Sequence, residues 1–162
     1  MITQSEKHTL SVLVENHFGV LARISSLISA RAFNIDSLTV STTEDPTISR
    51  MTIVVDADAA KLEQVKNQLN RLIDVIEVQE LKEGAFLDRE LLLARVNAEG
   101  KVKAAVEEIA KRFGAKLAEA NSHAVFIEAT GDTQALDQLV EQLRPHGITK
   151  LVRTGRIALE RS

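Results

Sequence analysis

The first half of the chain alternates between two patterns of apolar positions, one with the period of a strand and one with that of a helix. Leu10, Val12 and Val14 share one face of the segment 9–15, which predicts a half-buried strand. Further strand patterns cover 34–42, 48–56 and 75–81. Two helical stripes lie between them: Val20, Leu21, Ile24, Leu27 and Ile28, then Leu62, Val65, Leu69 and Leu72, with Asp58 as a cap for the second. The predicted order, β-α-β-β-α-β, is the ferredoxin-like arrangement.

The same order of elements occurs again after a short polar segment at 82–85. Asp132 or Thr133 can cap the second helix of this half, and Pro145-His146-Gly147 ends it. The chain is therefore predicted to be an α+β protein of two consecutive ferredoxin-like βαββαβ domains, at 8–83 and 84–162. Each half has only about 75–80 residues, so we expect partner subunits to cover part of each core. The strand patterns of this half lie at 90–96, 115–120, 124–129, 148–152 and 156–159, and its first helical stripe is Val102, Ala105, Val106, Ile109 and Phe113.

Composition changes this picture mainly by exclusion. The formal net charge is −3, Trp and Tyr are absent and Phe is sparse, so the chain lacks the basic surface and the stacking rings of a nucleic-acid-binding protein. Because there are no cysteines, disulfides and thiolate chemistry are excluded. The first eight residues are polar, and no run reaches the ~18 apolar residues of a membrane-spanning helix. We expect a cytoplasmic protein that binds neither nucleic acid nor membrane.

Candidate catalytic residues are scattered along the sequence. His8, His17, His123 and His146 form no pair at helical spacing, and no cysteine completes a zinc site. Serines of the first predicted helix lack the G-x-S-x-G pattern of a nucleophile elbow, and neither a Walker A sequence nor G-x-G-x-x-G occurs. We therefore expect no catalytic residues, no cofactor and no metal in this chain.

One segment carries the chemistry of a binding site. Asn16-His17-Phe18-Gly19-Val20-Leu21 joins the first strand to the first helix, where backbone N–H groups without partners can hold a carboxylate. Gly19 permits close approach to the backbone, and the Asn16 amide can bond a ligand. Asn34 begins the next strand and offers the same chemistry nearby, with Ile35 completing an aliphatic wall. The local pattern also fits a simpler interpretation, in which Asn16 is only a helix cap and Asn34 only a turn residue.

Longer stretches of sequence carry a resemblance to a known family. The run LSVLVENHFGVLARISSLISARAFNIDSLTV at 10–40 and SRMTIVV at 49–55 strongly resemble the acetolactate synthase small subunit. The likeness continues in LRPHGITKLVRTGRIAL at 143–159, so it covers almost the whole chain. The first half is similar to the ACT domain of that family, a fold that binds amino acids at domain interfaces, and the second half to an ACT-like domain.

The resemblance implies a regulatory subunit of branched-chain amino acid biosynthesis. Such a subunit binds the large catalytic subunit of acetolactate synthase, activates it, and confers feedback inhibition by valine. Thiamine diphosphate, magnesium and FAD are expected in that large subunit. ACT domains of two chains are expected to pair through edge strands into a homodimer with valine at the interface. The implied valine-binding residues are Asn16, Gly19, Val20, Leu21, Asn34 and Ile35.

Two departures from the family pattern bear on the effector. Ala32 stands where glycine is common, and Phe18 is bulkier than the residues that often precede Gly19. Either change could weaken the response to valine. Three other functions stay open: a free-standing amino-acid sensor acting on another protein, an RNA-binding split βαβ module, and an enzyme acting alone. The RNA module lacks its aromatic motif, because Arg50-Met51-Thr52-Ile53 occupies the third strand.

Overall fold

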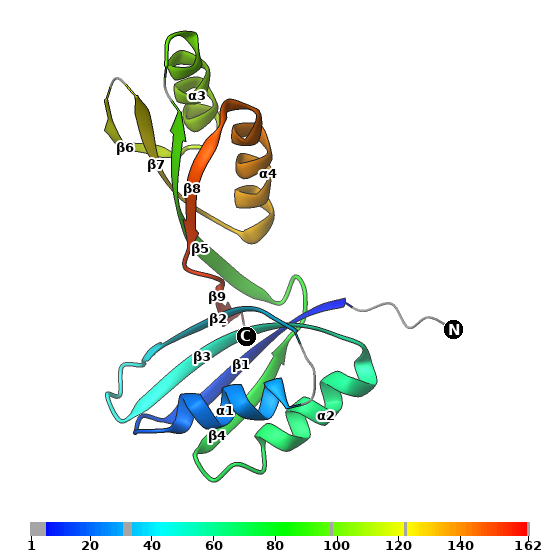
Figure 1. Ribbon diagram of the computed structural model, residues 1–162. Coiled ribbons are helices and arrows are strands. Elements are labelled where there is room, and N and C mark those ends of the chain that lie inside the picture. Colours follow the sequence, from blue (N-terminus) through cyan, green and yellow to red (C-terminus); the bar gives the residue numbers. More distant parts are fainter. Residues whose placement is uncertain (1–5, 31–33, 98, 122, 162) are drawn as a thin grey trace. The chain divides into compact units, whose positions relative to one another are not determined.

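The computed structural model describes residues 6–30, 34–97, 99–121 and 123–161. The chain divides into two compact units. The first holds the described residues up to Leu87 together with those from Arg156 onward, and the second runs from Asp88 to Gly155. Each unit has the ferredoxin-like topology predicted from the sequence, with helices on one face of an antiparallel sheet (Figure 1).

The first unit is a four-stranded sheet in the order β2-β3-β1-β4. Its strands are β1 (Glu6–Glu15), β2 (Asn34–Thr42), β3 (Ile48–Ala57) and β4 (Val75–Leu81), and its helices are α1 (Val20–Ser29) and α2 (Ala59–Leu69). The helices lie beside each other on one face of the sheet (Figure 1). Because β2 is at the edge of this order, one of its sides has no strand partner within the described part of the unit.

The core of the first unit follows the predicted periodicities. Leu10 of β1 pairs with Ile53 of β3, and both are fully buried beneath the helices. Ile24 and Ile28 of α1 enter the same cluster, as do the stripe residues of α2. Asp58 caps α2 as predicted, because its carboxylate accepts the Lys61 N–H at 2.8 Å.

The second unit repeats this design with the sheet order β6-β7-β5-β8. Asp132 is the cap of α4, and its carboxylate accepts the Ala135 N–H at 2.7 Å. The 3₁₀ turn Arg144–His146 ends that helix, and Gly147 follows with a φ of 85°. The elements are β5 (Phe86–Asn97), α3 (Lys101–Arg112), β6 (Lys116–Ala120), β7 (Ala124–Gly131), α4 (Thr133–Leu143) and β8 (Ile148–Arg153).

The end of the chain is grouped differently from the predicted boundary at 84. The last strand, β9 (Ile157–Glu160), pairs with β5 and belongs to the first unit. Two hydrogen bonds explain this grouping: the Arg161 N–H donates to the Ala85 carbonyl at 2.9 Å, and the Arg156 guanidinium donates to the Thr9 hydroxyl at 2.7 Å. These contacts between residues distant in sequence place the end of the chain in the first unit, although the sequence pattern assigns it to the second domain.

The helices of the described residues are all short. None combines the length and the apolar character that crossing a membrane requires.

Candidate functional site

The loop between β1 and α1 leaves the start of α1 open. Gly19 is the N-cap residue, with a φ of 86° in the left-handed region, and no side chain caps the helix. The first N–H groups of α1 are therefore not satisfied by a side-chain cap, which is the usual condition for an anion site at a helix start. The interpretation of Asn16 as only a helix cap is wrong.

Asn16 is instead held by the turn between β2 and β3. Its side-chain amide donates to the Pro46 carbonyl at 2.9 Å, and its backbone N–H donates to the Thr47 carbonyl at 2.7 Å. The turn is itself fixed by Asp45, whose carboxylate accepts the Thr47 hydroxyl at 2.6 Å and the Thr47 N–H at 2.8 Å. These two bonds hold the pKa of Asp45 below its ordinary value. Among the described residues the amide oxygen of Asn16 has no hydrogen-bond partner, so it can accept a bond from a ligand.

A buried carboxylate holds the same loop from the other side. Asp74, in the segment between α2 and β4, accepts the Arg23 guanidinium at 2.6 Å and lies 2.9 Å from Nε2 of His17. Its backbone carbonyl accepts the Glu15 N–H at 2.9 Å. The Asp74 side chain is only 8% exposed. Asp74 and Arg23 are not predicted from the sequence, because no spacing rule connects an acid of one loop to a helix so far away in the sequence.

The cluster around Asp74 also contains the atoms of a potential metal site. Ligand atoms of Glu15, His17 and Asp74 lie within 4.8 Å of one another. The Arg23 guanidinium already neutralises the Asp74 carboxylate, and a cation placed there would be repelled by it. We therefore interpret the cluster as an ion-pair network.

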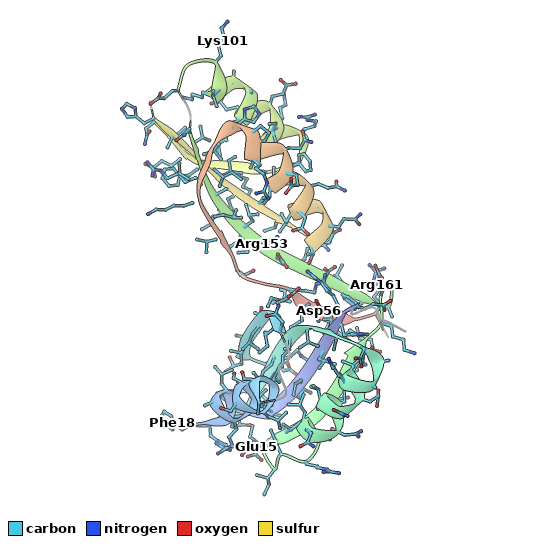
Figure 2. The ribbon with its side chains drawn as sticks, turned by 45° about the vertical axis from the view of Figure 1, so that its right-hand side comes forward. Glu15, Phe18, Asp56, Lys101, Arg153 and Arg161 are labelled. Atoms are coloured by element: carbon cyan, nitrogen blue, oxygen red, sulfur yellow. The ribbon has the colours of Figure 1, made fainter. Side chains whose placement is uncertain are left out.

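An open hollow of about 370 Å³ lies beside this loop, and its described lining residues are Asn16, His17 and Phe18. Phe18 is fully exposed and points away from the first unit, at the end of the sheet where Glu15 also lies (Figure 2). Val20 is buried in the core, whereas Leu21 is 43% exposed beside it. Leu21 is thus available to an apolar ligand, and Val20 packs the start of α1 against the core.

Asn34 and Ile35 do not join this end of the sheet within one chain. Asn34 pairs with Asp56, which pairs with Lys7, whereas Asn16 follows Glu15 at the far end of β1. Eight strand residues separate the two ends, a distance of about 27 Å at the rise of an antiparallel strand. The expectation that Asn34 lies near Asn16 is wrong for a single chain, because β3 separates β2 from β1 and the two asparagines occupy opposite ends.

The remaining site positions have distinct surroundings. The Asn34 side chain donates to Asp36 at 3.1 Å within β2, so Asn34 is a strand residue rather than a turn residue. Ile35 packs partly buried against the core. Ala32, the position at which glycine is common, lies outside the described residues. The first unit thus presents two separate groups of predicted site residues, one at each end of its sheet.

Comparisons with known proteins agree across both units. Residues 10–77 match the model of the AHAS small subunit-like ACT domain, and residues 89–162 match that of the small subunit of acetolactate synthase. A probable acetolactate synthase small subunit of Archaeoglobus fulgidus is 44% identical over 155 residues, which is 96% of this chain and 97% of that protein. The acetolactate synthase small subunit of Mycolicibacterium smegmatis is 44% identical over 154 residues, covering 95% of this chain and 91% of the relative.

A solved structure extends the agreement to three dimensions. The crystal structure of the acetolactate synthase small subunit from Thermotoga maritima matches with a TM-score of 0.88 and 28% identity, covering 97% of this chain and 98% of that one. The share of this chain that is covered includes both units. The sequence relatives and the shared fold lead to the same assignment: the chain belongs to the family of acetolactate synthase small subunits.

Proposed function

We propose that this chain is the regulatory partner of an acetolactate synthase large subunit in branched-chain amino acid biosynthesis. It activates that subunit and makes it sensitive to feedback inhibition by valine. The observation that carries the proposal is the 44% identity to small subunits along both units, since a likeness in the first unit alone would fit any ACT protein. Thiamine diphosphate, magnesium and FAD are cofactors of the large subunit in this proposal.

The geometry of the β1–α1 loop supports an amino acid as the effector. A carboxylate suits the uncapped N-terminus of α1 beyond Gly19, and an ammonium group suits the amide oxygen of Asn16. Leu21 is exposed and can cover a small apolar side chain, with Val20 beneath it. These three contacts fit a short aliphatic zwitterion such as valine.

The edge position of β2 supports a homodimer that unites the two separated groups of site residues. If two β2 strands pair antiparallel about a twofold axis, the beginning of one strand lies beside the end of the other. The Asn16 loop lies at the end of β2, because Thr42 pairs with Ser49 and Ile48 with Glu15. Asn34 and Ile35 of a second copy then reach the loop that Asn34 of the same chain cannot. Such pairing also removes two exposed strand edges.

Thermal unfolding of the full chain in a panel of L-amino acids tests the effector. A ligand at 100 times its Kd adds about 2.7 kcal/mol, and each kcal/mol raises the Tm of a chain of this size by about 2–4 °C. We expect valine to raise the Tm by several degrees, and serine and lysine to leave it unchanged. In the variant Asn16→Ala the shift should be lost while the Tm without ligand stays close to that of the original chain. No shift with any amino acid would contradict the effector assignment.

Co-purification with the large subunit tests the partner. We expect the tagged chain to retain that subunit and to raise its rate of acetolactate formation from pyruvate. A chain that responds to an amino acid but neither binds nor activates the large subunit would be a free-standing sensor acting on another protein.

A further inference from the structure

The Asp74 carboxylate is the most buried charged group at the proposed effector loop. A buried carboxylate is tolerated when charged partners and hydrogen bonds replace the water that it has lost. Asp74 has both: the Arg23 guanidinium at 2.6 Å on one oxygen and Nε2 of His17 at 2.9 Å on the other. Neither oxygen is left without a partner.

The three residues that Asp74 contacts bracket the effector loop. Its backbone carbonyl binds the N–H of Glu15, the last residue of β1, and its carboxylate binds His17 in the loop and Arg23 in the first turn of α1. Arg23 is linked in turn to Gly19, because its backbone N–H donates to the Gly19 carbonyl at 2.9 Å. A single acid of the α2–β4 segment therefore fixes the loop before, within and after the residues proposed to bind the effector.

We propose that Asp74 is the positioning residue of the effector loop, holding His17 and Arg23 so that Asn16 and the start of α1 are arranged for an amino acid before it arrives. This inference rests on the proposed function, because it concerns the same site. Binding to a loop that is already ordered avoids the entropy of ordering it, so the network acts on affinity without touching the ligand.

Calorimetric titration of the full chain with L-valine separates this role from a general effect on stability. Asp74→Asn should weaken valine binding about 10- to 100-fold, the loss expected for one or more hydrogen bonds to a charged group. Glu80→Gln is the matched control, because Glu80 also joins a histidine and a cation, His8 at 3.2 Å and Lys66 at 3.3 Å, but lies on β4 opposite Leu10. This control should bind valine within about twofold of the original chain.

Two further variants keep the test decisive if Asp74→Asn does not fold. Arg23→Gln removes a side chain that is 49% exposed, so the fold should persist while valine binding weakens. Arg23→Lys keeps a cation beside Asp74, so it should restore most of the valine affinity that Arg23→Gln loses, a rescue by charge that a purely structural role would not give. The double variant Asp74→Asn/Arg23→Gln should lose less affinity than the two single losses combined, since both break one network.

The outcomes distinguish the positioning role of Asp74 from the proposed effector site on which it depends. If the original chain binds no amino acid, the proposed effector site itself fails. If the original chain binds valine and folded Asp74→Asn or Arg23→Gln binds it equally well, the positioning role is overturned and the effector site stands. Equal valine affinities in Arg23→Lys and Arg23→Gln would show that the charge of Arg23 does not act on the loop.

Discussion

At the scale of a single residue, Gly19 is the N-cap of α1 and leaves the first N–H groups of the helix without a side-chain cap. Its φ of 86° lies in a region that residues with a side chain seldom adopt, and it turns the chain from β1 directly into the helix. Space is not the constraint, because a Cβ built at Gly19 would meet only Nη1 of Arg23 at 3.7 Å. The requirement for glycine is therefore conformational.

The variant Gly19→Ala should consequently lose stability through its backbone alone. We expect the free energy of unfolding to fall by about 1 kcal/mol, the usual penalty for an L side chain in the left-handed region. Urea denaturation measures this loss. Gly131→Ala is the control: Gly131 has no positive φ, and its added Cβ would make ordinary contacts at 3.6 Å with Ala135 and Leu136. A loss of the same size at Gly131 would show that volume, not φ, determines the result.

The sequence predicts individual residues well where the relevant chemistry is local. Asp58 is identified as a cap, and Asp132 is one of two candidates with Thr133, because a cap bonds an N–H three residues away. Asn16 is predicted as a site residue, but its hydrogen bond to Pro46 is not, since only the pairing of β1 with β3 brings the two residues together. Asp74 escapes prediction altogether, because its partners are brought to it by the packing of the whole unit.

At the scale of elements, the edge strand β2 differs from the corresponding edge strand of the second unit. β2 has nine residues and carries Leu38 and Ile35 against the core, whereas β6 has five residues, all exposed. A long edge strand with an apolar side offers a second copy more backbone hydrogen bonds and more apolar contact area than a short one does. Periodicity predicts both strands, but only the sheet order identifies them as edges.

A matched pair of lysine substitutions tests which edge forms the proposed homodimer. Val40 lies on the helix side of β2, opposite Met51, and is 42% exposed; Leu117 lies on the helix side of β6, opposite Ile127, and is 44% exposed. Val40→Lys would place an unpaired ammonium in the dimer seam and should raise the dimer Kd about tenfold or more. Leu117→Lys should leave it unchanged. Analytical ultracentrifugation measures both, and dimers equally stable in the two variants would contradict pairing through β2.

At the scale of the whole molecule, the two units are not two consecutive halves of the sequence, because the first unit also contains the end of the chain. The last strand, β9, is grouped with the first unit, so a cut at residue 84 would keep β9 with β5 but remove the hydrogen bond from Arg156 to Thr9 of β1. The order of helices and strands along each unit is what the periodic pattern predicts. The grouping of the chain's end is not, because nothing in the four residues Ile157–Glu160 indicates which strand they will join.

Control of a large subunit by valine requires that the two binding events be coupled, and such coupling is reciprocal. If valine changes the affinity of this chain for the large subunit by some factor, the large subunit must change the affinity for valine by the same factor. Coupling of this kind is typically worth about 1–3 kcal/mol, or about 5- to 150-fold in affinity.

Both factors can be measured on the same proteins. Titration of valine into the chain, alone and saturated with the large subunit, gives one factor. Titration of the chain into the large subunit, with and without valine, gives the other. We expect the two to agree, and we expect Asn16→Ala to reduce both to one while activation of the large subunit persists, because Asn16 acts on the effector and not on the partner. Valine-sensitive association with an unchanged valine affinity would contradict the scheme, since valine would then be acting on the large subunit itself.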